Sequence, residues 1–161
     1  MPLNNLRNAE ATLRQVSLFM EFDPHEMNTF LEFVDPIRFR AGETLMAQGE
    51  QTSGMFIVIE GRLRAVAKLP DGRRVVMHRM RSGDIYGELS IIDNYPRSAD
   101  LIVDEDCVVL KITNQVVETL FNLHPSAAFK ILLGISRTLV KRLRESDKKL
   151  LLDFPLEEGE D

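Results

Sequence analysis

The sequence contains one cysteine, Cys107, so an internal disulfide is excluded. An iron–sulfur cluster is excluded as well, because it needs several cysteine thiolates. Cys107 lies beside the apolar run 108–110, which predicts a buried and inert thiol. No apolar run approaches the ~20 residues that span a bilayer, and residues 1–8 lack the charged-then-apolar pattern of a signal peptide. We therefore expect a cytoplasmic protein.

Histidine is also scarce, and its placement argues against a metal enzyme. His25, His78 and His124 fall in three different predicted elements, with no carboxylate at a ligand-like spacing. The sequence thus predicts no catalytic metal, and we expect neither an enzyme nor a resident cofactor.

Net charge is −5, and the excess of acid is confined to one end of the chain. Residues 153–161 hold five acidic residues and no basic one, and the remaining residues balance at 20 basic against 20 acidic. A nucleic-acid binder normally shows a basic excess, which is absent here. We interpret 151–161 as a solvated acidic tail. The chain of 161 residues is long enough for one domain with a sizeable hydrophobic core.

In the opening segment, 1–34, apolar residues recur at the spacing of an α-helix, which predicts N-terminal helices. The apolar residues at this spacing in the expected helix, about 8–19, and directly after it are Leu13, Val16, Phe19 and Met20. A second helix should begin after Asp23, because Asp23 can cap it, Pro24 suits its first turn and Glu26 can reach back to the cap. Its predicted buried stripe is Met27, Phe30, Leu31 and Val34.

From residue 35 to 112 the hydrophobic period changes to two, which predicts strands. About eight short strands are expected, among them 37–40, 44–46, 55–59, 62–67, 73–80, 100–103 and 106–112. A hairpin turn is predicted at 70–72, and Gly42, Gly49 and Gly61 read as turn glycines. Many short strands at regular spacing indicate a mainly β fold, an eight-stranded β-roll or jelly roll, with flanking helices.

Helices resume in the segment 113–150. Thr113 can cap one helix, and Pro125 should start a second that runs to about Leu150. The apolar residues of this long helix form more than one narrow stripe, so it can pack on its own β-roll, on a second copy, or on both. Its far half is basic through Arg137, Lys141, Arg142, Arg144, Lys148 and Lys149, with Glu145 and Asp147 interspersed. We interpret this half as a solvated face, with a partner or polyanion as the alternative.

The stretch 86–92, followed after a short loop by 96–99, has the chemistry of a phosphate-ester pocket. Gly87 lets the backbone turn and lets a ligand approach closely. The following residues can form a helical turn whose free N–H groups suit an anion. Arg97 can grip two phosphate oxygens, and Ser98 can supply another donor.

Glu88 is the unexpected member of this group, because a carboxylate repels phosphate. A carboxylate can instead accept hydrogen bonds from a hydroxyl, such as a ribose 2′-OH. A residue that binds phosphate together with a residue that binds a sugar hydroxyl indicates a nucleotide ligand. The alternative from chemistry alone is that Glu88 and Arg97 form a surface salt bridge of little energetic value.

The pattern Tyr-Gly-Glu-Leu-Ser at 86–90, followed by Pro-Arg-Ser-Ala at 96–99, resembles the phosphate-binding cassette of cyclic-nucleotide-binding domains, with Tyr86 in place of the usual Phe. This family includes the catabolite activator protein and the regulatory subunits of cyclic-AMP-dependent protein kinase, and the resemblance extends from about Leu13 to about Leu143. It implies that Glu88 holds the ribose 2′-OH and Arg97 the cyclic phosphate, with backbone amides contributing. The ligand-binding residues that it implies are Gly87, Glu88, Leu89, Ser90, Arg97, Ser98 and Ala99.

The resemblance also implies a function, a regulatory sensor that signals when the long C-terminal helix moves. In the bacterial activators that helix forms the dimer seam, so we expect a homodimer. Thr138 and Arg142 are candidate base contacts, and cyclic AMP is favoured over cyclic GMP as the ligand. No helix-turn-helix domain follows Leu143, so we expect no DNA binding, no membrane association and an unknown output protein. The alternative is a protein-interaction module that binds no nucleotide physiologically.

Overall fold

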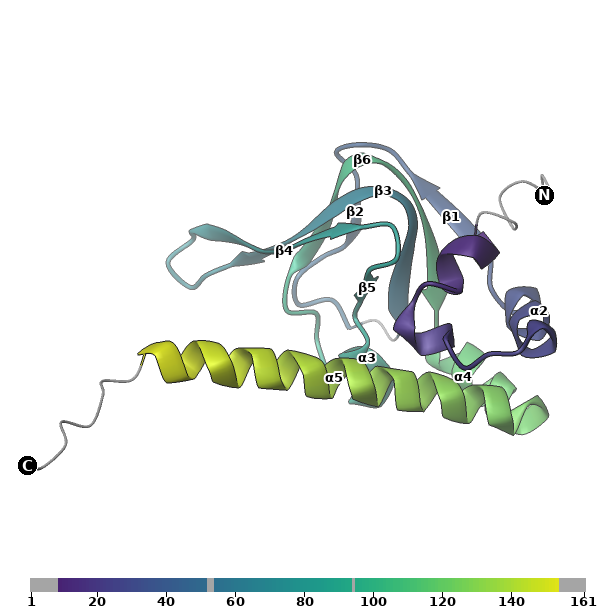
Figure 1. Ribbon diagram of the computed structural model, residues 1–161. Helices are drawn as coiled ribbons and strands as arrows, with labels where there is room; N and C mark the ends of the chain where they lie inside the picture. The colour runs from purple at the N-terminus through teal and green to yellow at the C-terminus, as the bar shows by residue number, and fades with distance from the viewer. Residues whose placement is uncertain (1–8, 52–53, 94, 154–161) are drawn as a thin grey trace, which may run out of the picture.

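The computed structural model describes residues 9–51, 54–93 and 95–153 and has a β-roll packed on helices, as expected (Figure 1). A sheet of six strands carries the fold, and its order is β1-β6-β3-β4, with β2 paired to β6 and β5 to β3. All pairings are antiparallel. The strands are β1 (Pro36–Phe39), β2 (Thr44–Met46), β3 (Met55–Lys68), β4 (Arg74–Arg81), β5 (Ile85–Tyr86) and β6 (Asp100–Ile112). The named helices are η1 (Ser17–Phe19), α2 (Pro24–Glu32), α3 (Leu89–Ile92), α4 (Asn114–Leu123) and α5 (Pro125–Asp153).

The expected eight strands become six in the described residues, because two predicted breaks are bends inside continuous strands. Gly61, expected as a turn, lies within β3 at φ +88°, and the pairing of β3 with β6 shifts register beside it. A Cβ at Gly61 would lie 2.7 Å from Cα of Cys107, so glycine permits this close crossing of the two strands. The segments 100–103 and 106–112 likewise join as β6.

Side chains of β3 alternate between two hydrophobic clusters, as the period of two requires. Met55, Ile57 and Ile59 point to the cluster shared with the helices. Phe56 and Val58 point into the interior of the roll, where the predicted buried thiol of Cys107 also lies. Burial raises the pKa of this thiol, so it stays protonated.

The N-terminal segment differs in part from its prediction. Residues 9–13 are helical, and the chain then tightens through short turns into η1, so 8–19 is not one continuous helix. Leu18 and Phe19 are both buried, and Met20 is 72% exposed rather than packed. The second prediction is confirmed. Asp23 and the N3 residue form a complete capping box at the start of α2.

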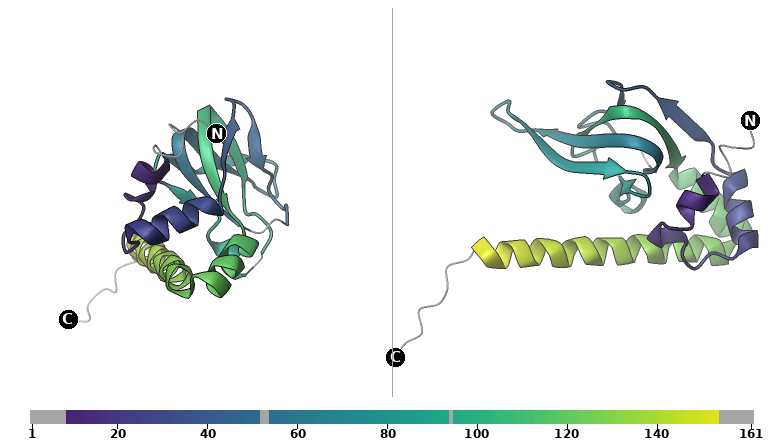
Figure 2. Two further views of the ribbon diagram at one scale, coloured as in Figure 1. Left: turned by 90° about the vertical axis from the view of Figure 1, so that its right-hand side faces the viewer. Right: turned by 45° about the horizontal axis from the view of Figure 1, so that its top comes forward.

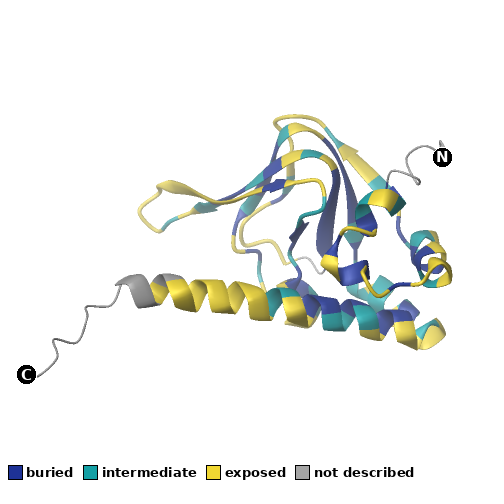
Figure 3. Cartoon of the chain, in the orientation of Figure 1, coloured by how far each residue is buried: buried dark blue, intermediate teal, exposed yellow. Residues whose placement is uncertain are grey.

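Helix α5 lies along one side of the roll, as the views in Figures 1 and 2 show. Ala127, Ala128, Ile131 and Ile135 bury its first half in the core that the helices share. At Gly134 a Cβ would lie 2.7 Å from Cα of Leu18, so glycine lets η1 pack directly on the helix. The second half is largely exposed (Figure 3) and continues through Asp153, into the segment expected as tail. Residues 154–161 lie outside the described part of the chain.

Thr113 caps α4 as predicted, because its hydroxyl accepts a hydrogen bond from the Val116 amide at 3.2 Å. Among the described residues, no helix is both long enough and apolar enough to cross a membrane. No three His, Cys, Asp or Glu side chains of the described residues come together in a way that could hold a metal ion.

Candidate functional site

The predicted cassette folds into a strand, a glycine turn and one short helix. β5 ends at Tyr86, Gly87 takes φ +84°, and α3 follows directly, with Glu88 at its N-cap position. A Cβ at Gly87 would collide with the Arg97 guanidinium and lie 3.2 Å from the Gly54 carbonyl oxygen. Glycine is therefore required here for two reasons, its positive φ and its lack of a side chain.

Arg97 is buried at the centre of the cassette, with 4% of its surface exposed. Its Nη1 donates to the Ser90 hydroxyl at 2.8 Å and to the Gly87 carbonyl at 3.4 Å, and its Nη2 donates to the Gly54 carbonyl at 2.5 Å. Burial lowers the pKa of Arg97, and the nearby Tyr86 and two acidic residues oppose that shift. The result is a rigidly held cation beneath the cassette.

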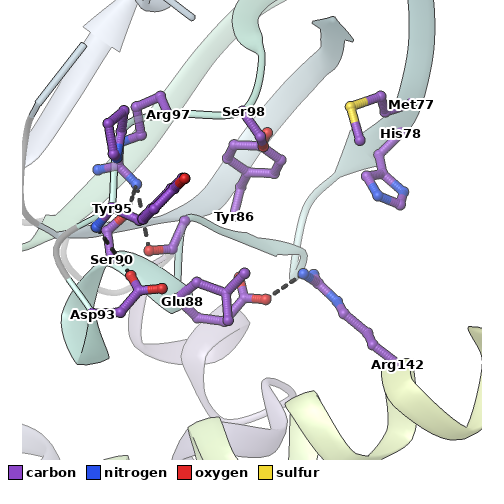
Figure 4. Close-up of a pocket in the computed structure, with 13 residues that line it drawn as sticks. Met77, His78, Tyr86, Glu88, Ser90, Asp93, Tyr95, Arg97, Ser98 and Arg142 are labelled. Carbon is purple, nitrogen blue, oxygen red and sulfur yellow. Dashed lines mark hydrogen bonds and ion pairs between the residues drawn. The ribbon is translucent and has the colours of Figure 1, made fainter. Parts of the chain in front are cut away.

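Glu88 is the second buried charged residue of the cassette, with 1% of its surface exposed. Oε1 accepts a short ion-paired hydrogen bond from Nη1 of Arg142, which reaches it from α5 (Figure 4). Arg142 also donates from Nη2 to the Ile85 carbonyl at 3.1 Å. Oε2 of Glu88 is buried and has no hydrogen-bond partner. A buried oxygen without a donor is costly, so Oε2 is a ready acceptor for an incoming hydroxyl or amine.

A cavity of about 250 Å³ opens between these two charged residues, and Figure 4 shows its lining. Of the predicted site residues it brings together Gly87, Glu88, Leu89, Ser90, Arg97, Ser98 and Arg142. Two predicted residues lie elsewhere. Ala99 is fully buried in the roll interior, and the Thr138 hydroxyl donates to the Gly134 carbonyl within α5. The Ser90 amide donates to the Gly87 carbonyl at 3.1 Å, so it is engaged within the turn.

Six residues that line the cavity were not predicted as ligand contacts. Two of them, Tyr86 and Pro96, belong to the cassette pattern itself, and the other four are Met77, His78, Asp93 and Tyr95. Met77 and His78 come from β4, whose alternation the sequence does show, but nothing in that alternation indicates which strand faces the cassette. Asp93 and Tyr95 belong to the loop between the two motif halves, where local composition carries no such signal.

The family of the chain follows from its match to a protein-family model. The model for the cyclic nucleotide-binding domain matches residues 36–124, more than half of the chain and all of the cassette. The chain belongs to the cyclic nucleotide-binding domain family. This is a regulatory, ligand-binding family rather than a catalytic one.

Similar proteins agree with this assignment. The chain is 25% identical over 138 residues to a CRP-like cAMP-activated global transcriptional regulator of Mycobacterium tuberculosis, covering 86% of this chain and 60% of that one. It is 27% identical over 142 residues to a cAMP-dependent protein kinase regulatory subunit of Aspergillus fumigatus, covering 88% of this chain and 31% of that one. The chain thus spans less than two thirds of either relative.

The fold is shared with a solved cyclic nucleotide-binding domain from Methylobacillus flagellatus. That match has a TM-score of 0.81 and 19% identity, and it covers 97% of this chain and 88% of that one. The predicted fold class, a β-roll with a long C-terminal helix, is confirmed.

Proposed function

We propose that this cyclic nucleotide-binding domain takes cyclic AMP in preference to cyclic GMP, and that Arg97 and Glu88 hold the two ends of its ribose phosphate. The observation that carries the proposal is the pair of buried charges of opposite sign, Arg97 at one side of the cavity and Glu88 at the other. A ligand that carries both an anion and a sugar hydroxyl complements both.

Arg97 is the phosphate holder. A cation that is already desolvated gains much from an anion, because the protein has removed the competing water. Its fork is held by Ser90 and two backbone carbonyls, so little side-chain freedom is lost on binding. Ser98 lines the same cavity and adds a hydroxyl donor.

Glu88 is the ribose holder. Oε2 needs a donor, and the ribose 2′-OH supplies one without bringing positive charge. Arg142 pairs with Glu88 in the structure. To contact the base, its guanidinium must either leave the Glu88 carboxylate or bind that carboxylate together with the ribose hydroxyl. Cyclic AMP is favoured for the base because relatives on two branches, a cAMP-activated regulator and a cAMP-dependent kinase subunit, carry that ligand in their names.

Movement of α5 is part of the proposal. The cavity, at about 250 Å³, is smaller than the roughly 300–1,000 Å³ typical of ligand pockets. Arg142 closes its α5 side through the ion pair with Glu88. A nucleotide that competes for Glu88 would weaken this contact, and α5 would shift to the extent that the ligand prefers the shifted state.

A movement of α5 can act as a signal only if another protein surface contacts this helix. Phe129 and Leu143 are exposed on one face of α5, 14 residues apart, and suit a homodimer seam between two copies. We place this sensor in the cytoplasm, with an output protein rather than DNA as its target, and with no enzyme activity or resident cofactor of its own.

Titration calorimetry with cyclic AMP, cyclic GMP and linear 5′-AMP tests the proposal. We expect micromolar or tighter binding of cyclic AMP, weaker binding of cyclic GMP and no comparable binding of the linear nucleotide. If neither cyclic nucleotide binds, the proposal is wrong and the domain acts as a protein-interaction module on the same fold.

A further inference from the structure

The exposed half of α5 carries a basic stripe, which we define as Lys141, Arg144 and Lys148. Their spacing of three and four residues puts them on one face of the helix. All three side chains are exposed, and none of them enters an ion pair or a side-chain hydrogen bond within the described ranges 9–51, 54–93 and 95–153. Two other cations of this half are engaged, since Arg137 pairs with Glu21 at 2.5 Å and Arg142 pairs with Glu88.

The stripe borders a groove on α5 whose floor is apolar. Leu133 and Val140 form the floor, while Arg137 and the basic stripe form the rim, and Glu145 is the one carboxylate among the residues that line the groove. Such a surface complements a segment that is rich in carboxylates.

The sequence supplies a matching segment immediately after α5. Residues 154–161 read Phe-Pro-Leu-Glu-Glu-Gly-Glu-Asp, with four acidic residues and no basic one. Pro155 cannot continue a helix and favours a change of chain direction at this point. We propose that this acidic segment folds back and docks on the basic stripe of its own α5.

The reach of the segment allows this docking. Eight extended residues span at most about 26–29 Å. With a rise of about 1.5 Å per residue, Lys148, Arg144 and Lys141 lie roughly 8, 14 and 18 Å back along the helix from Asp153. The short connection keeps the entropic cost of docking low and the local concentration of carboxylates high. The segment is therefore long enough for its carboxylates to reach all three cations of the basic stripe.

A nitroxide label on a Gly159→Cys variant tests the docking by the broadening of amide signals in nuclear magnetic resonance spectra. The buried thiol of Cys107 is poorly reactive, and wild-type protein treated with the label controls for it. We expect broadening of signals from residues 141–148 at low salt. Broadening at Lys141 and Arg144, which lie farther from the tether than Lys148, should weaken in 1 M salt, where the Debye length falls to about 3 Å.

Charge reversal provides the matched comparison. Lys141→Glu with Arg144→Glu should weaken the broadening at these two positions. Arg38→Glu in β1 with Arg40→Glu just after it changes the net charge equally, at exposed positions, and should preserve the broadening. Unchanged broadening in the first variant, or none in the labelled parent, overturns the proposal. Broadening that appears only when labelled and isotope-enriched copies are mixed overturns docking on the segment's own chain. None of these results depends on nucleotide binding, so the proposed function is tested separately.

Discussion

Arg142 of α5 and Glu88 of the cassette form the polar link between the long helix and the ligand cavity. They are 54 residues apart in sequence, and the pair joins an exposed helix to a carboxylate that is almost fully buried. Glu88 is consequently shared between two tasks, holding α5 and presenting Oε2 to the cavity. The first prediction follows from this sharing.

Glu88→Gln should remove the contribution of the ribose hydroxyl to binding. A hydrogen bond to a charged group contributes about 1.5–3 kcal/mol, so we expect cyclic AMP to bind roughly 10- to 150-fold more weakly. The 2′-deoxy analogue should show the same loss on wild-type protein and little further loss on the variant. Calorimetry on the four combinations gives the coupling energy directly. Additive losses would mean that Glu88 does not contact the 2′-OH.

Arg97→Lys should weaken binding while keeping the positive charge. Lysine cannot reproduce the fork that Ser90 and the two carbonyls hold, and we expect a loss of about 1.5–3 kcal/mol. Arg97→Ala should cost about 2–5 kcal/mol, because the cyclic phosphate then lacks its counter-charge. Arg38→Ala, on exposed β1, is the control. Affinity unchanged in both Arg97 variants would remove this residue from the site.

Gly87→Ala and Gly72→Ala form a matched pair. Both glycines have φ near +85°, so each substitution should cost about 1–2 kcal/mol of folding free energy from the strained backbone. Gly72 faces open space, whereas a Cβ at Gly87 meets the Arg97 guanidinium. We expect denaturant unfolding to show a larger loss for Gly87→Ala, and calorimetry to show lost nucleotide binding in that variant alone. Equal behaviour of the two variants would contradict the packing described here.

Glu26 ties α2 to α5, and this tie should be sensitive to acid. Its carboxylate accepts from Lys130 at 2.6 and 2.8 Å and from the Ser126 hydroxyl at 2.9 Å. Burial raises the pKa of Glu26, but the hydrogen bonds with Lys130, the Asp23 amide and Ser126 outweigh it and leave the pKa below its ordinary value of 4.5. Because the folded pKa is the lower one, the stabilisation is present above about pH 4.5 and is lost as the pH falls through the folded value.

Glu26→Ala should accordingly lower the free energy of unfolding by about 1.5–3 kcal/mol at neutral pH and flatten its decline in acid. Glu32→Ala, an exposed position at the end of the same helix, should change both quantities little. Urea unfolding at a series of pH values measures them. A parallel pH dependence in wild type and Glu26→Ala would show that the carboxylate contributes nothing to acid sensitivity.

Leu143→Glu should disrupt the proposed dimer. Leu143 is 63% exposed, and a charge in an apolar seam is left unpaired on both copies. Sedimentation equilibrium should show a shift from dimer to monomer, with Met20→Glu, an exposed apolar site on another element, retaining the dimer. A monomeric wild-type protein would refute the seam.

Much of the candidate site could be predicted from the sequence, because its main residues lie close together along the chain. Gly87, Glu88 and Arg97 sit within 11 consecutive residues, and their types alone indicate an anion and a hydroxyl. Capping signals at Asp23 and Thr113 were similarly local and are confirmed.

Contacts between distant segments were harder to predict. The strand breaks expected near Gly61 depend on how closely β6 crosses β3, and the position of Met20 depends on how η1 packs, neither of which a hydrophobic period reveals. His78 and Met77 reach the cavity only because β4 folds back beside β3.

The anchoring of α5 has a mechanical consequence. Its firm packing ends at Ile135 and its polar link at Arg142, while the helix continues to Asp153, roughly 27 Å beyond Ile135 at about 1.5 Å per residue. The helix is therefore a lever arm with its fulcrum in the helical core. A tilt of about 5° at the fulcrum moves the far end by roughly 2 Å, given an arm of about 27 Å.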